Sequence, residues 1–354
     1  MSREKFLTLS ATLVAVSALC HSAAAKESET AKPEEVETPA ASSTQKRYPP
    51  GDISQLGIDK KKPGDENVSP ISGKTYALKW IDDFEGDSLN TDNWVYETRN
   101  LNKWQIFVKR PQNVEVKDGN LHLIVRKEEK EYAGDIEPWH TEADRVTSHY
   151  TAGGINSNGK QAFQYGRFEI RAKLPYSYSL WPAFWTMGAN RGWPWGGEVD
   201  ICEFVGGFKD GRHRDAEYHS CLHWADPSLP NNLAWGTNKE IPKDAPDSLW
   251  NSTDTKMVHG ATFQLPSFKD SGGQKLADDW YVFGMEWTEK HIKFYCNDAV
   301  FQTVDITKES MREAYHQPHF IILNNFLGGE WPGYPNEKTV LPQSFIIDWV
   351  KVWQ

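Results

Sequence analysis

The sequence predicts an all-β protein that folds as two packed, curved antiparallel sheets. Short segments of alternating apolar and polar residues recur along the chain, with turn-forming residues between them. Helical periodicity is confined to residues 308–315. Many short strands without alternating helices favour a sandwich, and a curved sandwich offers a concave cleft across which a polymer can lie.

The expected strands can be placed one by one along the chain. Asp118-Gly119-Asn120 is a hairpin turn that separates two of them. Before this turn and after it, apolar residues at every second position or in short runs predict strands at 80–84, 113–116, 121–126, 153–157, 166–174 and 183–187. The same signals continue at 199–205, 217–224, 259–264, 280–287, 291–296, 319–325 and 344–353.

The first 72 residues differ in composition from the remainder. Residues 1–25 have the pattern of a secretory signal peptide, with Arg3 and Lys5 before an apolar stretch and small residues ending at Ala25. That stretch is too short to span a membrane. Residues 26–72 predict a disordered linker and an irregular lead-in. We therefore expect a secreted protein, cleaved near Ala25, with one folded domain at 73–354.

Charge and composition exclude some partners and favour another. The formal net charge is −10, which argues against nucleic acids and anionic membranes but allows a neutral polymer. Cys202, Cys221 and Cys296 follow the signal, and an odd number without regular spacing predicts no disulfide framework. The 16 tryptophans suit both a core and the C–H face of a sugar. Composition alone does not choose between these two uses, and we expect a monomer.

Three carboxylates lie within a run of six residues. Glu198 and Asp200 share one face of a strand, but Glu203 falls on the opposite face of a regular strand. One extra residue near Ile201 or Cys202, a β-bulge, would bring all three acids to the same face. Cys202 would then point away from the acids, into the core.

Two simpler interpretations of this cluster remain open. Most acidic clusters are solvated surfaces, and hard cations such as Ca²⁺ or Mg²⁺ also choose carboxylate oxygens. The apolar residues between the acids argue against a solvated surface, and a strand without loop carbonyls argues against a cation site. Three carboxylates on one face repel each other, and proteins keep such a cluster mainly where the resulting pKa shifts are useful. The cluster therefore favours catalysis by a pair of carboxyl groups.

The run from Glu198 to Glu203 resembles the bulged catalytic signature of glycoside hydrolase family 16. Further segments resemble the family in the expected order: Tyr-Gly-Arg-Phe-Glu-Ile-Arg-Ala-Lys-Leu-Pro at 165–175, Leu-Trp-Pro-Ala-Phe-Trp at 180–185, Leu-His-Trp at 222–224, Gly-Gly-Glu-Trp-Pro-Gly at 328–333 and Asp-Trp-Val-Lys-Val-Trp at 348–353. The resemblance covers residues 75–354, is nearest to the laminarinase-like branch, and implies a concanavalin A-like β-jelly-roll.

The resemblance also implies a role for each acid. Glu198 would be the nucleophile, Glu203 the general acid/base, and Asp200 the residue that holds and tunes the pair. Retaining hydrolysis needs one ionised and one protonated carboxyl group, about 5–5.5 Å apart. No cofactor is expected for this chemistry.

Further residues are implied to bind the substrate or a metal ion. Trp181, Trp185, His223, Asn324, Trp331 and Trp104 are candidates for sugar contact, with core packing as the alternative for the tryptophans and a structural role for the histidine. A structural Ca²⁺ is implied at the side chain of Asp348 and the backbone carbonyls of Asp83 and Gly119, which an ordinary turn would also explain.

Substrate specificity is where the sequence departs from the laminarinase pattern. Residues 101–106 carry Lys103 and Trp104 where a typical Asn-Asn-Glu-Leu-Gln run is expected, and long segments at 128–149 and 226–254 can shape a binding site. We expect an endo-acting β-1,3-glucanase or mixed-linkage glucanase. The alternatives are the same reaction on a marine galactan such as agarose or porphyran, and a non-catalytic sugar-binding sandwich.

Overall fold

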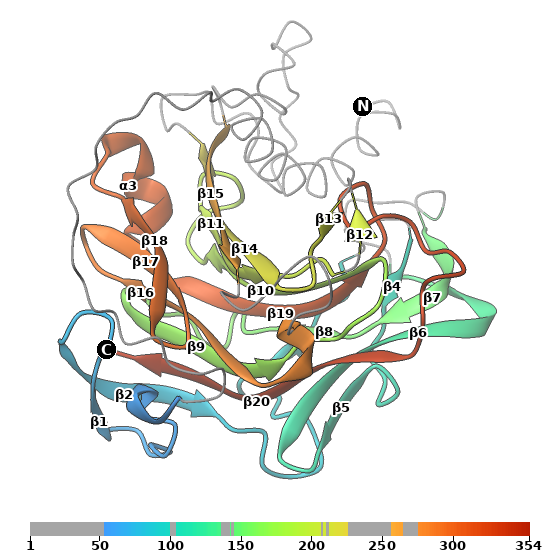
Figure 1. Ribbon diagram of the computed structural model, residues 1–354, viewed down its shortest axis with the longest axis horizontal. Coiled ribbons are helices and arrows are strands. Elements are labelled where there is room, and N and C mark those ends of the chain that lie inside the picture. The colour runs from blue at the N-terminus through green and yellow to red at the C-terminus, as the bar shows by residue number, and fades with distance from the viewer. Residues whose placement is uncertain are drawn as a thin grey trace, which may run out of the picture.

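The computed structural model describes residues 53–99, 104–135, 142, 145–206, 208–209, 212–225, 256–264 and 275–354. The predicted signal peptide, residues 26–52, Lys103 and the segment 226–254 lie outside these residues. Within the described ranges, no helix is long and apolar enough to cross a membrane. The described elements form two stacked sheets (Figure 1).

The larger sheet has 11 strands. They are β1 (Glu66–Val68), β2 (Thr75–Asp82), β4 (Ile106–Phe107), β5 (Val114–Lys117), β6 (Asn120–Ala133), β7 (Thr147–Ala152), β9 (Gly166–Lys173), β16 (Tyr281–Trp287), β17 (His291–Cys296), β18 (Ala299–Asp305) and β20 (Gln343–Trp353). The main order is β18-β17-β16-β9-β20-β6-β7-β4, while β2 pairs with β20, β1 with β2, and β5 with β6. Its pairs are antiparallel apart from β4 with β7.

The smaller sheet has seven strands, in the order β15-β14-β11-β10-β19-β8-β3. Their bounds are β3 (Val95–Tyr96), β8 (Gly154–Asn156), β10 (Leu180–Gly188), β11 (Glu198–Glu203), β14 (Glu217–Ala225), β15 (Lys256–Gln264) and β19 (His319–Leu327). A separate pair joins β12 (Phe208–Lys209) to β13 (Arg212–His213), and the described helices are η1 (Ser54–Leu56), η4 (Leu276–Asp278) and α3 (Glu309–Tyr315). Figure 1 shows this sheet curving from β19 and β10 toward β14 and β15.

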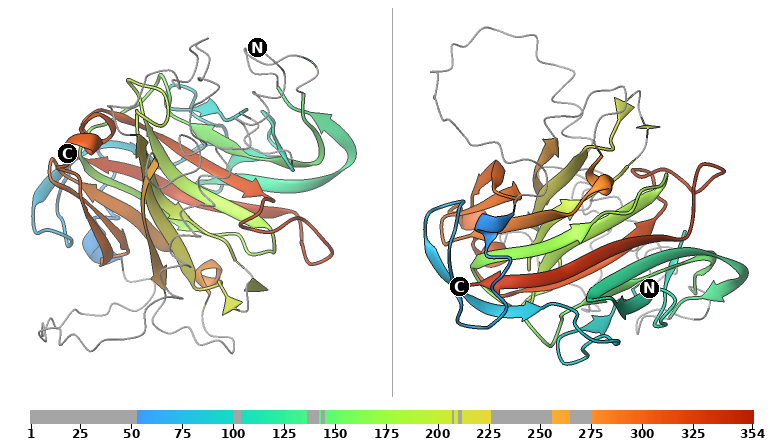
Figure 2. Two further views of the ribbon diagram at one scale, coloured as in Figure 1. Left: turned by 90° about the horizontal axis from the view of Figure 1, so that it is seen from above. Right: turned by 60° about the horizontal axis from the view of Figure 1, so that its bottom comes forward.

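The main hydrophobic core lies between the two sheets. Phe184, Val199 and Ile201 enter it from the smaller sheet, and Phe283 and Val350 enter it from the larger one. Burying each such side chain contributes about 1.5–3 kcal/mol. Because side chains alternate along a strand, the neighbouring residues of β10 and β11 lie on the opposite side of the smaller sheet. We call this side the acid face, and Figure 2 shows the two layers from other directions.

The outer side of the larger sheet is covered by the lead-in segment. Ile53 and Leu56 pack there against Val282, Tyr295 and Trp349. The ammonium group of Lys351 donates hydrogen bonds of 3.0 Å to the carbonyls of residues 57 and 58. The folded domain therefore begins before residue 73. The segment 53–72 is polar on average, and its few apolar side chains are the ones that pack against the sheet.

A fully buried ion pair lies beneath the lead-in. Arg167 donates to Glu169 at 2.7 Å, and both side chains are 0% exposed. The same carboxylate accepts hydrogen bonds from the hydroxyl of Tyr295 at 2.8 Å and the indole N–H of Trp353 at 2.7 Å. These partners satisfy both oxygens of a charge that would otherwise be costly to bury.

The predicted fold class is confirmed, and the local differences have identifiable causes. The turn predicted at residues 118–120 joins β5 to β6, and Asp118 and Gly119 both have positive φ angles there. The helix predicted at 308–315 is α3. The segment 128–149 is not simply a loop, because β6 extends to Ala133 and pairs with β7. The short strands β3 and β4 are too brief to show a period in the sequence.

Candidate active site

The β-bulge predicted from the spacing of the acids is present in β11. Asp200 lies opposite Trp185 of β10, and Cys202 lies opposite the adjacent residue Phe184. Strand β11 therefore has one extra residue, Ile201, between these two pairs. The pairing with β14 shifts at the same place, between Asp200 and Glu203. Ile201 and Cys202 both belong to the core as a result. Glu203 therefore returns to the acid face.

An indole group holds the carboxyl group of Glu203 in place. Trp181 comes from β10, and its N–H donates a 3.0 Å hydrogen bond to Oε1 of Glu203. Both side chains are buried, with exposed fractions of 4% and 3%. The bond fixes one carboxyl oxygen and orients the other. Trp181 thus has a specific polar contact as well as the sugar-stacking role predicted for it.

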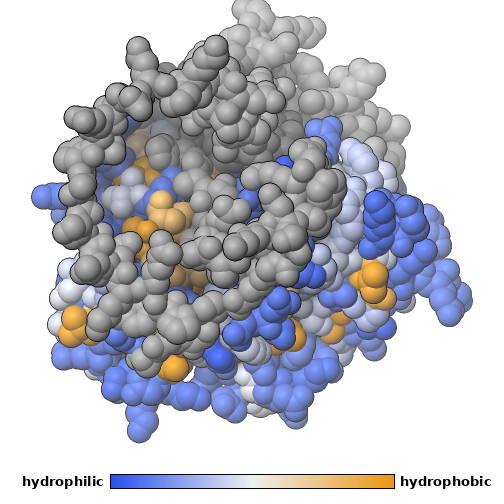
Figure 3. All heavy atoms as spheres, in the orientation of Figure 1, coloured by the Kyte–Doolittle hydropathy of each residue, from blue (hydrophilic) through white to orange (hydrophobic). Residues whose placement is uncertain are grey.

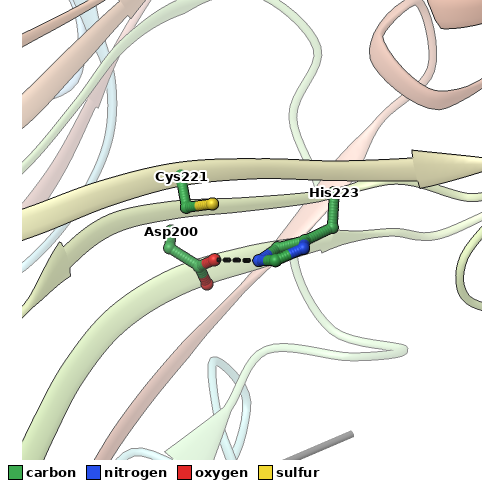
Figure 4. A group of neighbouring side chains, drawn as sticks. All are labelled: Asp200, Cys221 and His223. Atoms are coloured by element: carbon green, nitrogen blue, oxygen red, sulfur yellow. Dashed lines mark ion pairs between the residues drawn. The ribbon is translucent and has the colours of Figure 1, made fainter. Parts of the chain in front are cut away.

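Asp200 is paired with the histidine that the sequence singled out. Nε2 of His223, on β14, lies 3.1 Å from Oδ2 of Asp200. Figure 4 shows the carboxylate directed at the imidazole ring, with Cys221 beside both. One ligand atom from each of the three lies within 4.8 Å of the others, a spacing that could hold a metal ion, and no other such group occurs among the described residues. The contact with His223 places this cluster within the acid face.

Glu198 and Asp200 form a coupled pair of carboxyl groups. Burial, together with the charge of Asp200, raises the pKa of Glu198 to about 8, while His223 and a hydrogen bond from the Trp193 side chain act in the opposite direction. Burial raises the pKa of Asp200 to about 7. The two groups hydrogen-bond to each other, so the proton that they hold near neutrality belongs to the pair.

Strand β14 provides two further polar residues, Glu217 and His219, that the sequence did not identify as part of the site. Its register places His223 opposite Glu198 and His219 opposite Glu203, so each outer acid faces a histidine across the strand pair. Nε2 of His219 lies 3.9 Å from Oε1 of Glu217. Alternation along 217–223 was the available signal, because residues two apart share a face.

The remaining predicted sugar-binding residues divide into two groups. Asn324 of β19 lies beside the acids, and its Oδ1 accepts a 2.6 Å hydrogen bond from the indole N–H of Trp185. Trp331 lies beyond the end of β19, with ring centroids 5.0 Å from Trp181 and 5.1 Å from His219. Trp104 lies farther away and packs against Tyr334, at 4.6 Å between centroids. The structure therefore places five of the six around the acids and Trp104 at an outer position.

The predicted calcium residues lie close together at neighbouring strand ends, but the carboxylate among them already contacts a cation. In β20, Ile347 pairs with Leu121 of β6 and Val350 pairs with Asp82 of β2, so Asp348 lies near the ends of both strands, next to which Gly119 and Asp83 stand in the chain. The carboxylate of Asp348 is held by Arg171 at 2.6 Å. A calcium ion would have to compete with Arg171 for the Asp348 carboxylate, and its binding stays a prediction.

Comparison with known protein families identifies the family of this chain. Residues 78–354 match the family described as "Beta-porphyranase A-D, GH16 domain". The chain belongs to glycoside hydrolase family 16. Both the predicted family and the predicted sandwich are therefore confirmed. Hydrolysis in family 16 needs no cofactor.

Two curated relatives and one solved structure extend this assignment. The chain is similar to glucan endo-1,3-beta-glucosidase A1 of Niallia circulans, with 25% identity over 301 residues covering 78% of this chain and 38% of that protein. It is 25% identical over 295 residues to keratan-sulfate endo-1,4-beta-galactosidase of Sphingobacterium multivorum, covering 81% and 57%. The chain thus spans less than two thirds of either relative.

The solved structure shares the fold over most of this chain. The endo-beta-1,3-glucanase of Pyrococcus furiosus has a TM-score of 0.60 and 27% identity, covering 80% of this chain and 96% of that one. The similar proteins therefore include enzymes named for glucans and one named for keratan sulfate. The family assignment supports an endo-glycosidase, and the choice of polymer belongs to the proposal below.

Proposed function

We propose that this protein cleaves a β-linked polysaccharide internally, with retention of configuration, by means of Glu198 and Glu203. The observation that carries the proposal is the bulge, which brings both glutamates and Asp200 to one buried face. Glu198 attacks the anomeric carbon while Glu203 protonates the departing glycosidic oxygen. Water, deprotonated by Glu203, then releases the sugar from Glu198.

The residues around the three acids support an assignment of which acid carries a proton and which attacks as a carboxylate. Oε1 of Glu203 accepts from Trp181, which supports Oε2 as the oxygen that carries the transferred proton. Glu198 and Asp200 share one proton, and its transfer toward Asp200, which contacts His223, lets Glu198 attack as a carboxylate. A pure sugar-binding protein would have no use for this repulsion, which argues against the non-catalytic alternative.

We propose a galactan of the porphyran type as the substrate. The match over residues 78–354 to the β-porphyranase family supports this choice, and the similarity to a galactosidase acting on keratan sulfate adds to it. The ranking differs from the sequence-based expectation, which placed β-1,3-glucan first. The departure at residues 101–106 from the laminarinase pattern agrees with the new ranking.

A β-1,3-glucan or mixed-linkage glucan is the second candidate. It is favoured by the similarity to the Niallia glucosidase and by the 27% identity to the Pyrococcus glucanase. Secretion after cleavage near Ala25 and a monomeric state remain predictions from the sequence.

Incubation of the purified protein with porphyran, agarose, laminarin and lichenan tests both candidates. The expected result is a ladder of oligosaccharides from porphyran, and NMR of early products should show the β-anomer. Release of the α-anomer would refute the retaining mechanism, and cleavage confined to laminarin or lichenan would establish the second candidate. Glu198→Ala should abolish turnover while leaving binding intact, and the isosteric Glu198→Gln variant checks that folding is not the cause.

A further inference from the structure

Two loops meet beside the Glu203 end of the acid face. One precedes β10, at residues 174–179, and the other joins β19 to β20, at residues 328–342. The hydroxyl of Ser179 donates to the carbonyl of Gly333 at 2.6 Å, and the backbone N–H of Gly328 donates to the carbonyl of Ser179 at 2.8 Å. The backbone N–H of Val340 donates to the hydroxyl of Ser177 at 2.7 Å. The loops are therefore tied to each other in a defined arrangement.

The longer loop connects the acids to an exposed aromatic ring. Its Trp331 contacts Trp181, which in turn binds Glu203. Three residues further on, Tyr334 lies against Trp104, with the two rings inclined at 42°. Gly328 has a φ of +79°, and a Cβ there would come within 2.8 Å of the Trp104 side chain. The backbone thus approaches Trp104 closely and supports the ring pair.

Tyr334 is exposed where large apolar residues are otherwise scarce. On the face drawn in Figure 3 the described surface is mostly hydrophilic, with one larger hydrophobic group toward the left and separate small spots elsewhere. Among the described residues, the exposed large hydrophobics are Val68, Tyr176, Tyr334 and Val340, and all except Val68 lie on the two loops. The ring of Tyr176 is covered by the ammonium group of Lys275 at 4.0 Å, and its hydroxyl donates to Asp215. Tyr334, 45% exposed, is the other exposed aromatic ring in the part of the chain that the structure describes.

We propose that Tyr334, supported by Trp104, is an outer sugar-binding platform that stacks on a pyranose ring of the substrate chain beyond Glu203. This inference rests on the proposed function, because it takes the occupant to be the polysaccharide that the acids cleave. The continuous contacts from Glu203 through Trp181 and Trp331 place the platform next to the site. A single exposed ring matches the size of a sugar, whereas a stable protein partner needs roughly 1,000 Å² of interface.

Gel retardation in porphyran, agarose and laminarin tests the platform directly. In a Glu198→Gln background, Tyr334→Ala should weaken binding to the retained polymer about three- to tenfold, since an aromatic stacking contact is worth about that factor. Tyr334→Trp should keep the binding. Val340→Ala removes exposed apolar surface from the same loop without removing a ring, and should bind as the parent does.

Oligosaccharides of increasing length locate the platform. Titration calorimetry should show that Tyr334→Ala lowers affinity for long chains and leaves the shortest bound chains unaffected. Equal binding of Tyr334→Ala and its parent to every polymer would overturn the platform, even if the wild-type protein hydrolyses porphyran. A wild-type protein that binds the polymers through Tyr334 without cleaving any of them would instead overturn only the proposed hydrolysis. Binding of none of the polymers would overturn both.

Discussion

Replacement of Trp181 by phenylalanine isolates the hydrogen bond that orients Glu203. The variant keeps an aromatic ring on β10 but removes the N–H that lies 3.0 Å from Oε1 of Glu203. A hydrogen bond to a charged group contributes about 1.5–3 kcal/mol, more than a neutral pair. Because this donor favours the ionised carboxylate, its loss lets Glu203 keep its proton to higher pH.

The magnitude of the effect follows from the same energy. At about 1.4 kcal/mol per pH unit, the basic limb of the kcat/KM profile should move upward by roughly one unit or more. We also expect kcat to fall about tenfold or more, because the acid is weaker and less well oriented. Hydrolysis measured across pH with the preferred polysaccharide gives both quantities.

Trp185→Phe is the matched control for this experiment. Trp185 lies on the same strand and is equally buried, at 4% exposed, but its N–H donates to Oδ1 of Asn324 rather than to a carboxylate. Its variant should leave the basic limb in place. If Trp181→Phe also leaves the basic limb in place, or if both variants shift it equally, the positioning role of Trp181 is refuted.

Three further predictions concern other buried ionisable groups. In Asp200→Asn, loss of the neighbouring negative charge should lower the pKa of Glu198, so the acid limb of kcat/KM should move to lower pH; an upward shift would contradict the coupling. Burial lowers the pKa of His319 to about 4, so stability present above its unfolded pKa near 6.5 should fall by up to about 3 kcal/mol as pH drops toward 4. Urea unfolding at pH 7 and 4.5 should show a smaller difference for His319→Gln, and an unchanged difference would exclude this residue as the cause. Glu169→Gln leaves Arg167 without its charged partner and should reduce the free energy of unfolding by about 3–5 kcal/mol while kcat/KM stays near wild type; calorimetry together with hydrolysis assays checks both.

Strand parity was sufficient to predict how the three acids are arranged. Glu203 could reach the face of Glu198 only through an extra residue, and the physical rule of alternation leaves few places for it. The pairing of Asp200 with His223 was not visible in the same way, because register between distant strands depends on the folded sheets. For Trp181, the sequence indicated the face but not the hydrogen bond, since an indole can stack, pack or donate.

Other features depended on long-range contacts that local patterns do not contain. The segment 53–72 is polar on average, and only the folded sheet shows that Ile53 and Leu56 cover Trp349. The strand β6 continues beyond residue 126 through charged residues because β7 provides a hydrogen-bonding partner. His219 and Glu217 were placed on a strand correctly, yet their proximity to the acids follows from the register of β14 with β11.

The packing of the lead-in has a consequence for where the gene can be divided. The family match begins at residue 78, and a polypeptide starting there would contain the three acids of β11 and every strand of the smaller sheet. It would lack Ile53 and Leu56, leaving Val282, Tyr295 and Trp349 open to water, and it would remove two carbonyl acceptors from Lys351. Such a fragment would expose a hydrophobic patch on the outer side of the larger sheet and would tend to aggregate. A boundary drawn from homology alone would therefore be misleading for recombinant expression.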